Sequence, residues 1–177
     1  METWIALLRG INVSGKNIIK MAELIEALSE TSLSNIRTYI QSGNILFESG
    51  KVEPVILEKI IGDKIRERFD LEVPVRVLTR DALKHISASN PFITEHNLLP
   101  EKLHLTLLSA LPDPVLLSKL DASVFSPDAF IVSGKAIYLN CPEDYGRTKL
   151  TNTFFEKKLK VSATTRNWAT VVKLCSF

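Results

Sequence analysis

A stretch near the N-terminus reads YIQSGNILF (residues 39–47), and a second, FIVSGKAIY (residues 130–138), repeats its pattern 91 residues later. In each stretch, two apolar runs flank a Ser-Gly pair. This arrangement is typical of a β-hairpin, because glycine adopts the positive φ that tight hairpin turns require. The repeated hairpin predicts a chain whose two halves share one architecture.

Hydrophobic spacing predicts matching elements around both hairpins. Around the first hairpin we expect a strand over 4–8, a helix over 21–28, a helix over 54–65 and a strand over 73–78. Around the second we expect a strand over 103–108, helices over 114–120 and 148–159, a brief strand over 161–163 and a last helix. Each half therefore follows β-α-β-β-α-β, the split βαβ pattern of ferredoxin-like folds. The predicted fold is α+β, with two duplicated ferredoxin-like halves (1–90 and 91–177), each a mixed or antiparallel sheet with helices packed on it.

Composition limits the class of protein further. The 177 residues are 45% hydrophobic and 24% charged, which is typical of globular proteins and excludes disordered, collagen-like and coiled-coil chains. No apolar run approaches the ~18 residues of a membrane span, so no membrane partner is expected. Two cysteines and an N-terminus without a signal-peptide pattern indicate a reduced, cytoplasmic location.

Charge is distributed unevenly along the chain. Residues 145–177 contain seven basic residues and one acidic residue, a net charge of +6, whereas the first 144 residues carry 15 bases and 19 acids, a net charge of −4. A basic C-terminal segment suggests an anionic partner or attraction to the rest of the chain. Alternatively, these residues only keep the terminal helices soluble. Nucleic acid is a possible partner, although 7% aromatic residues and a pI near 8.5 are low for a dedicated nucleic-acid binder.

One loop is longer in the first half than in the second. The first strands of the halves are about 99 residues apart and the hairpins 91, so about eight extra residues precede the first hairpin, in the segment GINVSGKN (residues 10–17). This segment nearly matches the phosphate-binding pattern G-x-x-x-x-G-K-[ST]. However, Asn17 replaces the magnesium-binding hydroxyl and the helical pattern starts only at Met21, which disfavours an NTPase. In the alternative interpretation, Asn12 and Ser14 bond to their own backbone in a structural crossover.

Four segments also carry a family resemblance. ALLRGINVSGKN (6–17), RTYIQSGN (37–44), YGRTKLTN (145–152) and ATTRNW (163–168) resemble, in order, the signatures of a bacterial family known as domain-of-unknown-function 1697. The resemblance implies a bacterial, cytoplasmic protein with two ferredoxin-like halves. It implies no particular activity.

The chain offers little for covalent or metal catalysis. It has no G-x-S-x-G elbow, no C-x-x-C or H-x-x-x-H spacing, and its histidines, His85, His96 and His104, occur in unrelated contexts. No base can be assigned to Cys141. Catalytic residues therefore stay unknown, whether the protein is an enzyme stays open, and no metal or cofactor is expected.

Cations at predicted helix starts point to an anion instead. A positive charge there opposes the helix dipole by ~0.3–1 kcal/mol, yet Lys16 and Lys20 precede the first helix and Arg147 and Lys149 surround the predicted start at Thr148. Arg166 stands before the last helix in the same way. A bound anion would compensate both the cations and the helix ends. Alternatively, the cations pair with carboxylates elsewhere in the fold. In that interpretation Thr148, Thr164 and Thr165 cap the helices, whereas Thr151 and Asn152 lie too far inside the predicted helix to cap it.

We therefore predict binding of a small phosphate-bearing, nucleotide-like anion by basic helix starts and the Gly-rich loop. The alternatives are an enzyme of phosphoryl or acyl transfer that uses the same residues, and a nucleic-acid or protein-interaction module. The ligand's identity and the oligomeric state stay open. The predicted ligand-binding residues are Arg9, Asn12, Lys16, Asn17, Gln41, Asn44, Tyr145, Arg147, Lys149, Arg166 and Asn167.

Overall fold

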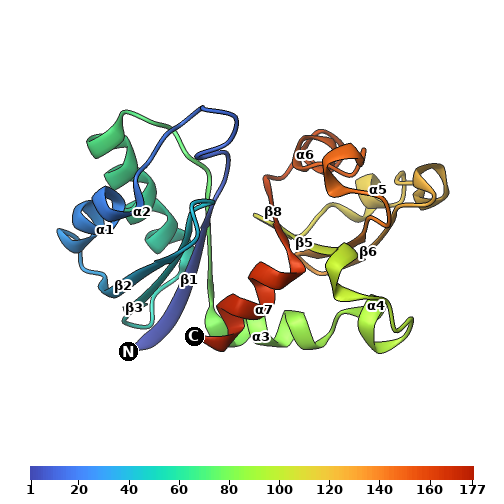
Figure 1. Ribbon diagram of the computed structural model, residues 1–177, viewed down its shortest axis with the longest axis horizontal. Helices are drawn as coiled ribbons and strands as arrows, with labels where there is room; N and C mark the ends of the chain where they lie inside the picture. The colour runs from blue at the N-terminus through green and yellow to red at the C-terminus, as the bar shows by residue number, and fades with distance from the viewer. The chain divides into compact units, whose positions relative to one another are not determined.

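The computed structural model describes all residues, Met1–Phe177, and is shown as a ribbon in Figure 1. The chain divides into two compact units, Met1–Leu83 and Lys84–Phe177. Residues 84–90, which the sequence analysis placed in the first half, thus group with the second unit. Each unit contains one four-stranded antiparallel sheet with helices packed on it, which confirms the α+β class and the two ferredoxin-like halves.

The first unit follows the predicted element order. Its elements are β1 (Glu2–Leu8), α1 (Met21–Ser29), β2 (Ser34–Tyr39), β3 (Asn44–Ser49), α2 (Pro54–Phe69) and β4 (Val75–Thr79). The strand order in the sheet is β2-β3-β1-β4, and every pair is antiparallel. In the two central ladders, Ala6 of β1 lies opposite Ile45 of β3 and Val77 of β4. Both helices cover the same face of this sheet (Figure 1).

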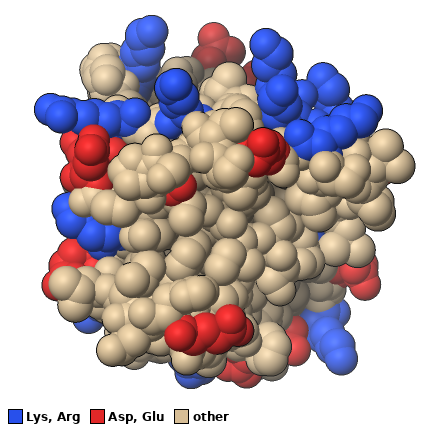
Figure 2. All heavy atoms as spheres, turned by 90° about the vertical axis from the view of Figure 1, so that its right-hand side faces the viewer, with Lys and Arg blue, Asp and Glu red and all other residues tan.

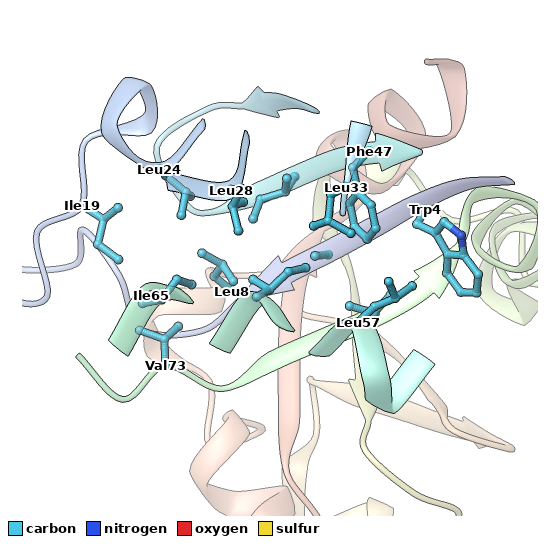
Figure 3. Close-up of a cluster of buried hydrophobic side chains, with 14 of the residues drawn as sticks. Trp4, Leu8, Ile19, Leu24, Leu28, Leu33, Phe47, Leu57, Ile65 and Val73 are labelled. Atoms are coloured by element: carbon cyan, nitrogen blue, oxygen red, sulfur yellow. The ribbon is translucent and has the colours of Figure 1, made fainter. Parts of the chain in front are cut away.

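Apolar side chains fill the space between this sheet and its helices. Trp4, Ala6 and Leu8 alternate along β1 and are buried together with Leu24 of α1 and Leu57 of α2 (Figure 3). Residues two apart in a strand share a face, so this alternation places the apolar set against the helices. Full burial of one such side chain contributes about 1.5–3 kcal/mol. The intervening residues Ile5 and Leu7 are buried as well, so the near-continuous apolar run of β1 corresponds to burial on both of its faces.

The second unit repeats this topology. Its sheet contains β5 (Leu103–Leu108), β6 (Ala129–Ser133), β7 (Ala136–Asn140) and β8 (Ala163–Asn167), in the order β6-β7-β5-β8. This order matches that of the first sheet position by position. The main helices are α6 (Asn152–Leu159) and α7 (Trp168–Ser176); α3 (Arg80–Ala88) joins the units, and the short helices are α4 (Pro91–Thr94) and α5 (Pro114–Leu117). Single 3-10 turns occur at Pro100–Lys102, Ala122–Phe125 and Tyr145–Arg147.

Aromatic rings build much of the second core. Phe155 is fully buried, and its ring makes edge-to-face contacts with Phe154 and Phe130 at centroid distances of 5.2 and 5.7 Å. Phe125 contacts Phe154 in the same geometry at 5.0 Å. Such pairs add ~0.5–1.5 kcal/mol beyond the burial of their area. The rings thus hold α6 on the sheet.

Two predicted boundaries in this unit were wrong. Helix α6 begins at Asn152 rather than Thr148, with Thr151 as its cap, because the Thr148 hydroxyl is bound to the Asp128 carboxylate and accepts a hydrogen bond from the Leu150 N–H. Strand β8 covers Ala163–Asn167 instead of 161–163, so Thr164 and Thr165 lie in a strand and cap no helix. None of the helices combines the length and the apolar character that crossing a membrane would require.

Candidate functional site

The predicted residues of the first unit lie at one end of its sheet. Arg9 follows the last residue of β1, and Asn44, the first residue of β3, lies opposite Leu7. Gln41 lies in the turn between β2 and β3, so it is at the same end. The sheet register therefore brings together the long loop after β1 and the hairpin turn.

The amide of Asn12 holds this loop in place. Its Nδ2 donates to the Ile19 carbonyl at 2.9 Å and to the Gln41 carbonyl at 2.8 Å, while its Oδ1 accepts from the Ile19 N–H at 2.8 Å. The Asn17 amide donates to the Gly10 carbonyl at 2.8 Å. The Asn17 amide is thus used within the loop, and the Asn12 amide is bonded both to the loop backbone and to the hairpin turn, in agreement with the structural alternative for Asn12.

The tip of the loop is a tight turn that exposes Lys16. Ser14 and Gly15 have φ values of 50° and 72°, and the Lys16 N–H donates to the Val13 carbonyl at 2.9 Å. Two successive residues with positive φ are the mark of a type I′ turn. The Lys16 side chain is exposed and forms no ion pair. Lys20, in contrast, lies 3.2 Å from the Glu23 carboxylate, so for this lysine the alternative of a carboxylate partner is correct.

The hairpin turn is equally well fixed. Asn44 is fully buried, and its Nδ2 donates to the Tyr39 carbonyl and the Ser42 hydroxyl, both at 3.0 Å. The Leu8 N–H donates to the Gly43 carbonyl at 2.8 Å, which ties the turn to β1. Asn44 is therefore a structural residue of the turn, and Gln41 presents an exposed side chain beside it.

In the second unit, side chains cap the helix starts that were expected to attract an anion. The Phe154 N–H donates to the Thr151 hydroxyl at 3.1 Å at the start of α6, and the Thr170 N–H donates to the Asn167 side chain at 2.8 Å at the start of α7. Arg147 and Lys149 precede α6 as exposed side chains without an ion pair. The helix ends thus have their own acceptors, and the basic side chains remain as separate cations.

Arg166 lies within β8, opposite Leu105, rather than at the exposed start of a helix. Its Nη1 donates to the Thr165 carbonyl at 3.0 Å. Burial of the guanidinium lowers the pKa of Arg166 to about 10. The group is still a cation at neutral pH, but one removed from most of its water.

Two cavities in the second unit contain predicted site residues. The smaller, of about 160 Å³, is lined by Arg147 and Lys149 together with Asp128, Glu143 and Asp144. The larger, of about 390 Å³, contains two more predicted residues, Tyr145 and Asn167, whereas Arg166 lines neither cavity. The lining of the larger cavity also includes Pro100, Glu101, Lys102, His104, Cys141, Glu143, Asp144 and Trp168. Both cavities therefore mix bases with carboxylates. A similar mixture occurs across the face in Figure 2, where basic side chains gather toward the upper edge and acidic ones are scattered.

His104 in the larger cavity is a residue that the sequence analysis set aside. Its imidazole stacks on the Tyr145 ring at a centroid distance of 4.3 Å and an interplanar angle of 19°. Burial lowers the pKa of His104, and the backbone of Lys102 and the charge of Asp144 offset this only in part. Nearby, burial raises the pKa of the Cys141 thiol to about 11, so the thiol stays protonated at neutral pH. No group of three His, Cys, Asp or Glu side chains is placed to hold a metal ion.

Comparison with known proteins agrees with the first two sequence motifs. A family model described as "Protein of unknown function (DUF1697)" matches residues 1–138. The chain belongs to the DUF1697 family. Two of the motifs, at 145–152 and 163–168, lie beyond the matched residues. No curated protein matches this DUF1697 chain.

A solved structure shares the fold of this DUF1697 protein. It is that of the conserved bacterial protein SP0830 from Streptococcus pneumoniae, with a TM-score of 0.66 and 22% sequence identity. The match covers 99% of this chain and 97% of the other, so the likeness includes both ferredoxin-like units.

Proposed function

We propose that this DUF1697 protein binds the phosphate group of a small, nucleotide-like molecule at the loop over residues 9–20 of the first unit. The observation that carries the proposal is the exposed Lys16 ammonium, which has no carboxylate partner and stands on a turn that the Asn12 and Asn17 amides fix. Residues 9–22 contain three basic residues and no acidic one. The surroundings of Lys16 therefore favour an anion.

The shape of the turn supports the same chemistry. A Cβ added at Gly15 would meet nothing within 4 Å, so a phosphate oxygen can approach the backbone at this point. Successive backbone N–H groups in a turn form a concave anion site, and an ammonium adds a charge-assisted contact. Because the loop is already ordered, binding would cost little conformational entropy.

The geometry favours binding over nucleotide hydrolysis. Asn17 has no hydroxyl for a metal ion, its amide is bonded to the Gly10 carbonyl, and α1 begins only at Met21. In the second unit, Arg147 and Lys149 are exposed cations that a further phosphate could use, but three carboxylates line the same cavity. We therefore assign the primary contact to the first unit and keep nucleic acid as an alternative ligand.

The test compares Lys16→Ala with Lys51→Ala. Lys51 is an exposed lysine without an ion pair in the segment between β3 and α2, so both variants remove the same charge. Thermal unfolding is followed against inorganic phosphate, pyrophosphate and AMP, with chloride at equal ionic strength as a reference. We expect stabilisation of the wild-type protein and of Lys51→Ala. The affinity of Lys16→Ala should fall roughly tenfold or more, as expected for a lost charge-assisted contact of ~1.5–3 kcal/mol.

Without ligand, Lys16→Ala should unfold within about 0.5 kcal/mol of wild type, because the side chain is exposed. An equal response of both variants to all three phosphates would refute the site. If only a single-stranded oligonucleotide binds, with an affinity that falls steeply with salt, the nucleic-acid alternative is favoured instead.

A further inference from the structure

We propose that the larger cavity of the second unit, beside His104 and Tyr145, binds a small organic cation with N–H donors, an ammonium or an amidinium. This site is independent of the phosphate site proposed above. It also reassigns Tyr145 and Asn167, which the sequence analysis grouped with the anion-binding residues. Three separate observations support it: the size of the cavity, the character of its wall and the charges around it.

The size and the wall of the cavity suit a small molecule. Its volume of about 390 Å³ is within the ~300–1,000 Å³ of small-molecule sites. The stacked rings of His104 and Tyr145 form a flat aromatic wall that their contact holds in one orientation. Buried Trp168 lies beside them in the lining. An aromatic wall of this kind attracts both planar ligands and cations.

The charges around the cavity select a cation. Glu101, Glu143 and Asp144 line it, and none of these carboxylates is in an ion pair. The basic residue of the lining, Lys102, points its Nζ at the Glu143 backbone carbonyl, 3.4 Å away. The cavity thus has three carboxylates against one ammonium, and His104 adds no positive charge at neutral pH because burial lowers its pKa.

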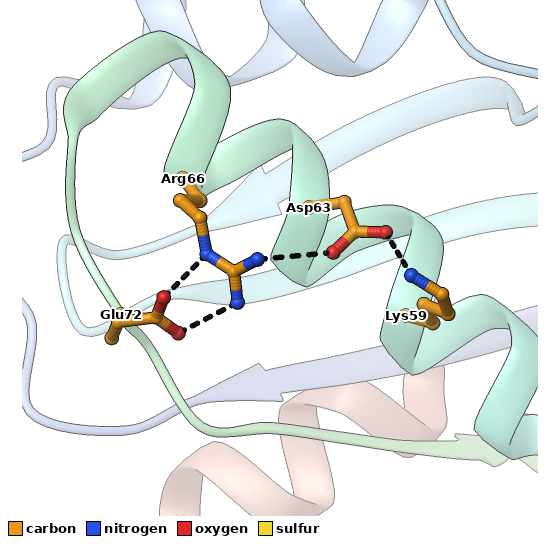
Figure 4. Close-up of polar contacts among 4 residues, drawn as sticks. All are labelled: Lys59, Asp63, Arg66 and Glu72. Atoms are coloured by element: carbon orange, nitrogen blue, oxygen red, sulfur yellow. Dashed lines mark hydrogen bonds and ion pairs between the residues drawn. The ribbon is translucent and has the colours of Figure 1, made fainter.

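Carboxylates of the first unit, in contrast to those at the cavity, are engaged in ion pairs. Arg66 lies between Glu72 and Asp63, donating to Glu72 at 2.9 Å and approaching Asp63 at 3.7 Å, and Lys59 binds Asp63 at 2.5 Å (Figure 4). These exposed carboxylates have cationic partners within their own unit. The carboxylates at the cavity form no ion pair, although Lys102 lines the same cavity and Arg147 and Lys149 line the smaller one beside Glu143 and Asp144.

The hydrogen-bonding groups specify N–H donors on the ligand. The carboxylates of the lining accept hydrogen bonds, and an ammonium or an amidinium supplies N–H donors to them. A phosphate or carboxylate ligand would instead face three negative charges.

The experiment uses the full chain and two probes of similar shape, benzylammonium and its neutral analogue benzyl alcohol. Binding is followed by two-dimensional NMR through the His104 and Tyr145 ring signals. Glu101→Gln and Glu143→Gln each remove one carboxylate, and Glu95→Gln removes an exposed carboxylate of the same unit away from the cavity. All three side chains are exposed, so the amide dispersion of each variant should match wild type.

We expect benzylammonium to shift both rings saturably, and benzyl alcohol to bind at least tenfold more weakly. Glu101→Gln and Glu143→Gln should each weaken the benzylammonium affinity several-fold, and the double variant more than tenfold, while Glu95→Gln should leave it unchanged. The proposal is overturned if the rings do not respond to benzylammonium, if benzyl alcohol binds equally well, or if the double variant keeps the wild-type affinity.

Discussion

Two glycines with the same backbone conformation differ in what surrounds them. Gly43 in the β2–β3 turn has φ +77° and Gly15 at the tip of the long loop has φ +72°. A Cβ at Gly43 would lie 2.7 Å from both the Leu8 Cβ and the Ile11 Cδ1, whereas one at Gly15 would meet nothing within 4 Å. Gly43 is therefore required by conformation and by packing, and Gly15 by conformation alone.

This difference gives a matched prediction at the residue scale. Alanine at either position must adopt a left-handed backbone conformation, which lowers the free energy of unfolding by about 1–2 kcal/mol. At Gly43 it must also displace buried apolar neighbours, which adds about 1–3 kcal/mol. We therefore expect Gly43→Ala to lower the free energy of unfolding clearly more than Gly15→Ala, as measured by urea denaturation. Equal losses would show that the contact of the turn with Leu8 and Ile11 is not tight.

At the scale of the element, the start of α6 depends on one hydroxyl. Thr151 accepts from the Phe154 N–H, and no acidic residue lies in the first turn to supplement it. Thr153, the second residue of α6, is exposed in this same first turn. The two threonines are thus two residues apart, but the position of Thr151 needs a side-chain acceptor, whereas the position of Thr153 favours a residue with high helix propensity.

Alanine should therefore act in opposite directions at these two sites. Thr151→Ala removes the cap and should lower the free energy of unfolding by about 1 kcal/mol. Thr153→Ala should be neutral or raise it by a few tenths of a kcal/mol, because alanine has the higher helix propensity. Thermal or chemical denaturation of both variants checks this. A loss at Thr153 as large as that at Thr151 would contradict the assignment of the cap.

At the scale of the whole molecule, His104 links stability to pH. Its folded pKa lies below the ordinary value of 6.5, chiefly because burial disfavours the charged imidazole. Between the folded pKa and 6.5, the unfolded chain therefore binds more protons than the folded chain. The free energy of unfolding consequently increases as the pH rises through this window and decreases as the pH falls through it. The effect belongs to the folding equilibrium of the chain, although one side chain causes it.

His104→Gln should flatten this pH dependence, and His96→Gln should keep it. His96 is an exposed histidine of the same unit and serves as the control. The measurement is the urea midpoint of each protein from about pH 5 to pH 7, a range that brackets the ordinary histidine pKa. A slope that persists in His104→Gln would assign the proton uptake to another group.

The order of the elements was readable from the sequence because its signals are local. The near-continuous apolar run of residues 4–8 and the Ser-Gly turns of both hairpins need no distant partner to be recognised. Two such hairpins in matching contexts led to the ferredoxin-like topology that both sheets have. The extra length between β1 and α1 was also visible, since it is a difference in spacing alone.

Only the tertiary structure decided which polar groups were already in use. Thr148 appeared free to begin a helix, but its hydroxyl is bound to Asp128, twenty residues earlier, and the helix starts at Asn152. Asn12 appeared available for a ligand, but its amide connects Ile19 to the Gln41 carbonyl, 29 residues away. A hydrogen bond between residues far apart in the chain produces no periodic pattern in the sequence, whereas the apolar face of a helix or strand does. The sequence by itself therefore determined the architecture, and packing decided which side chains remain available for a ligand.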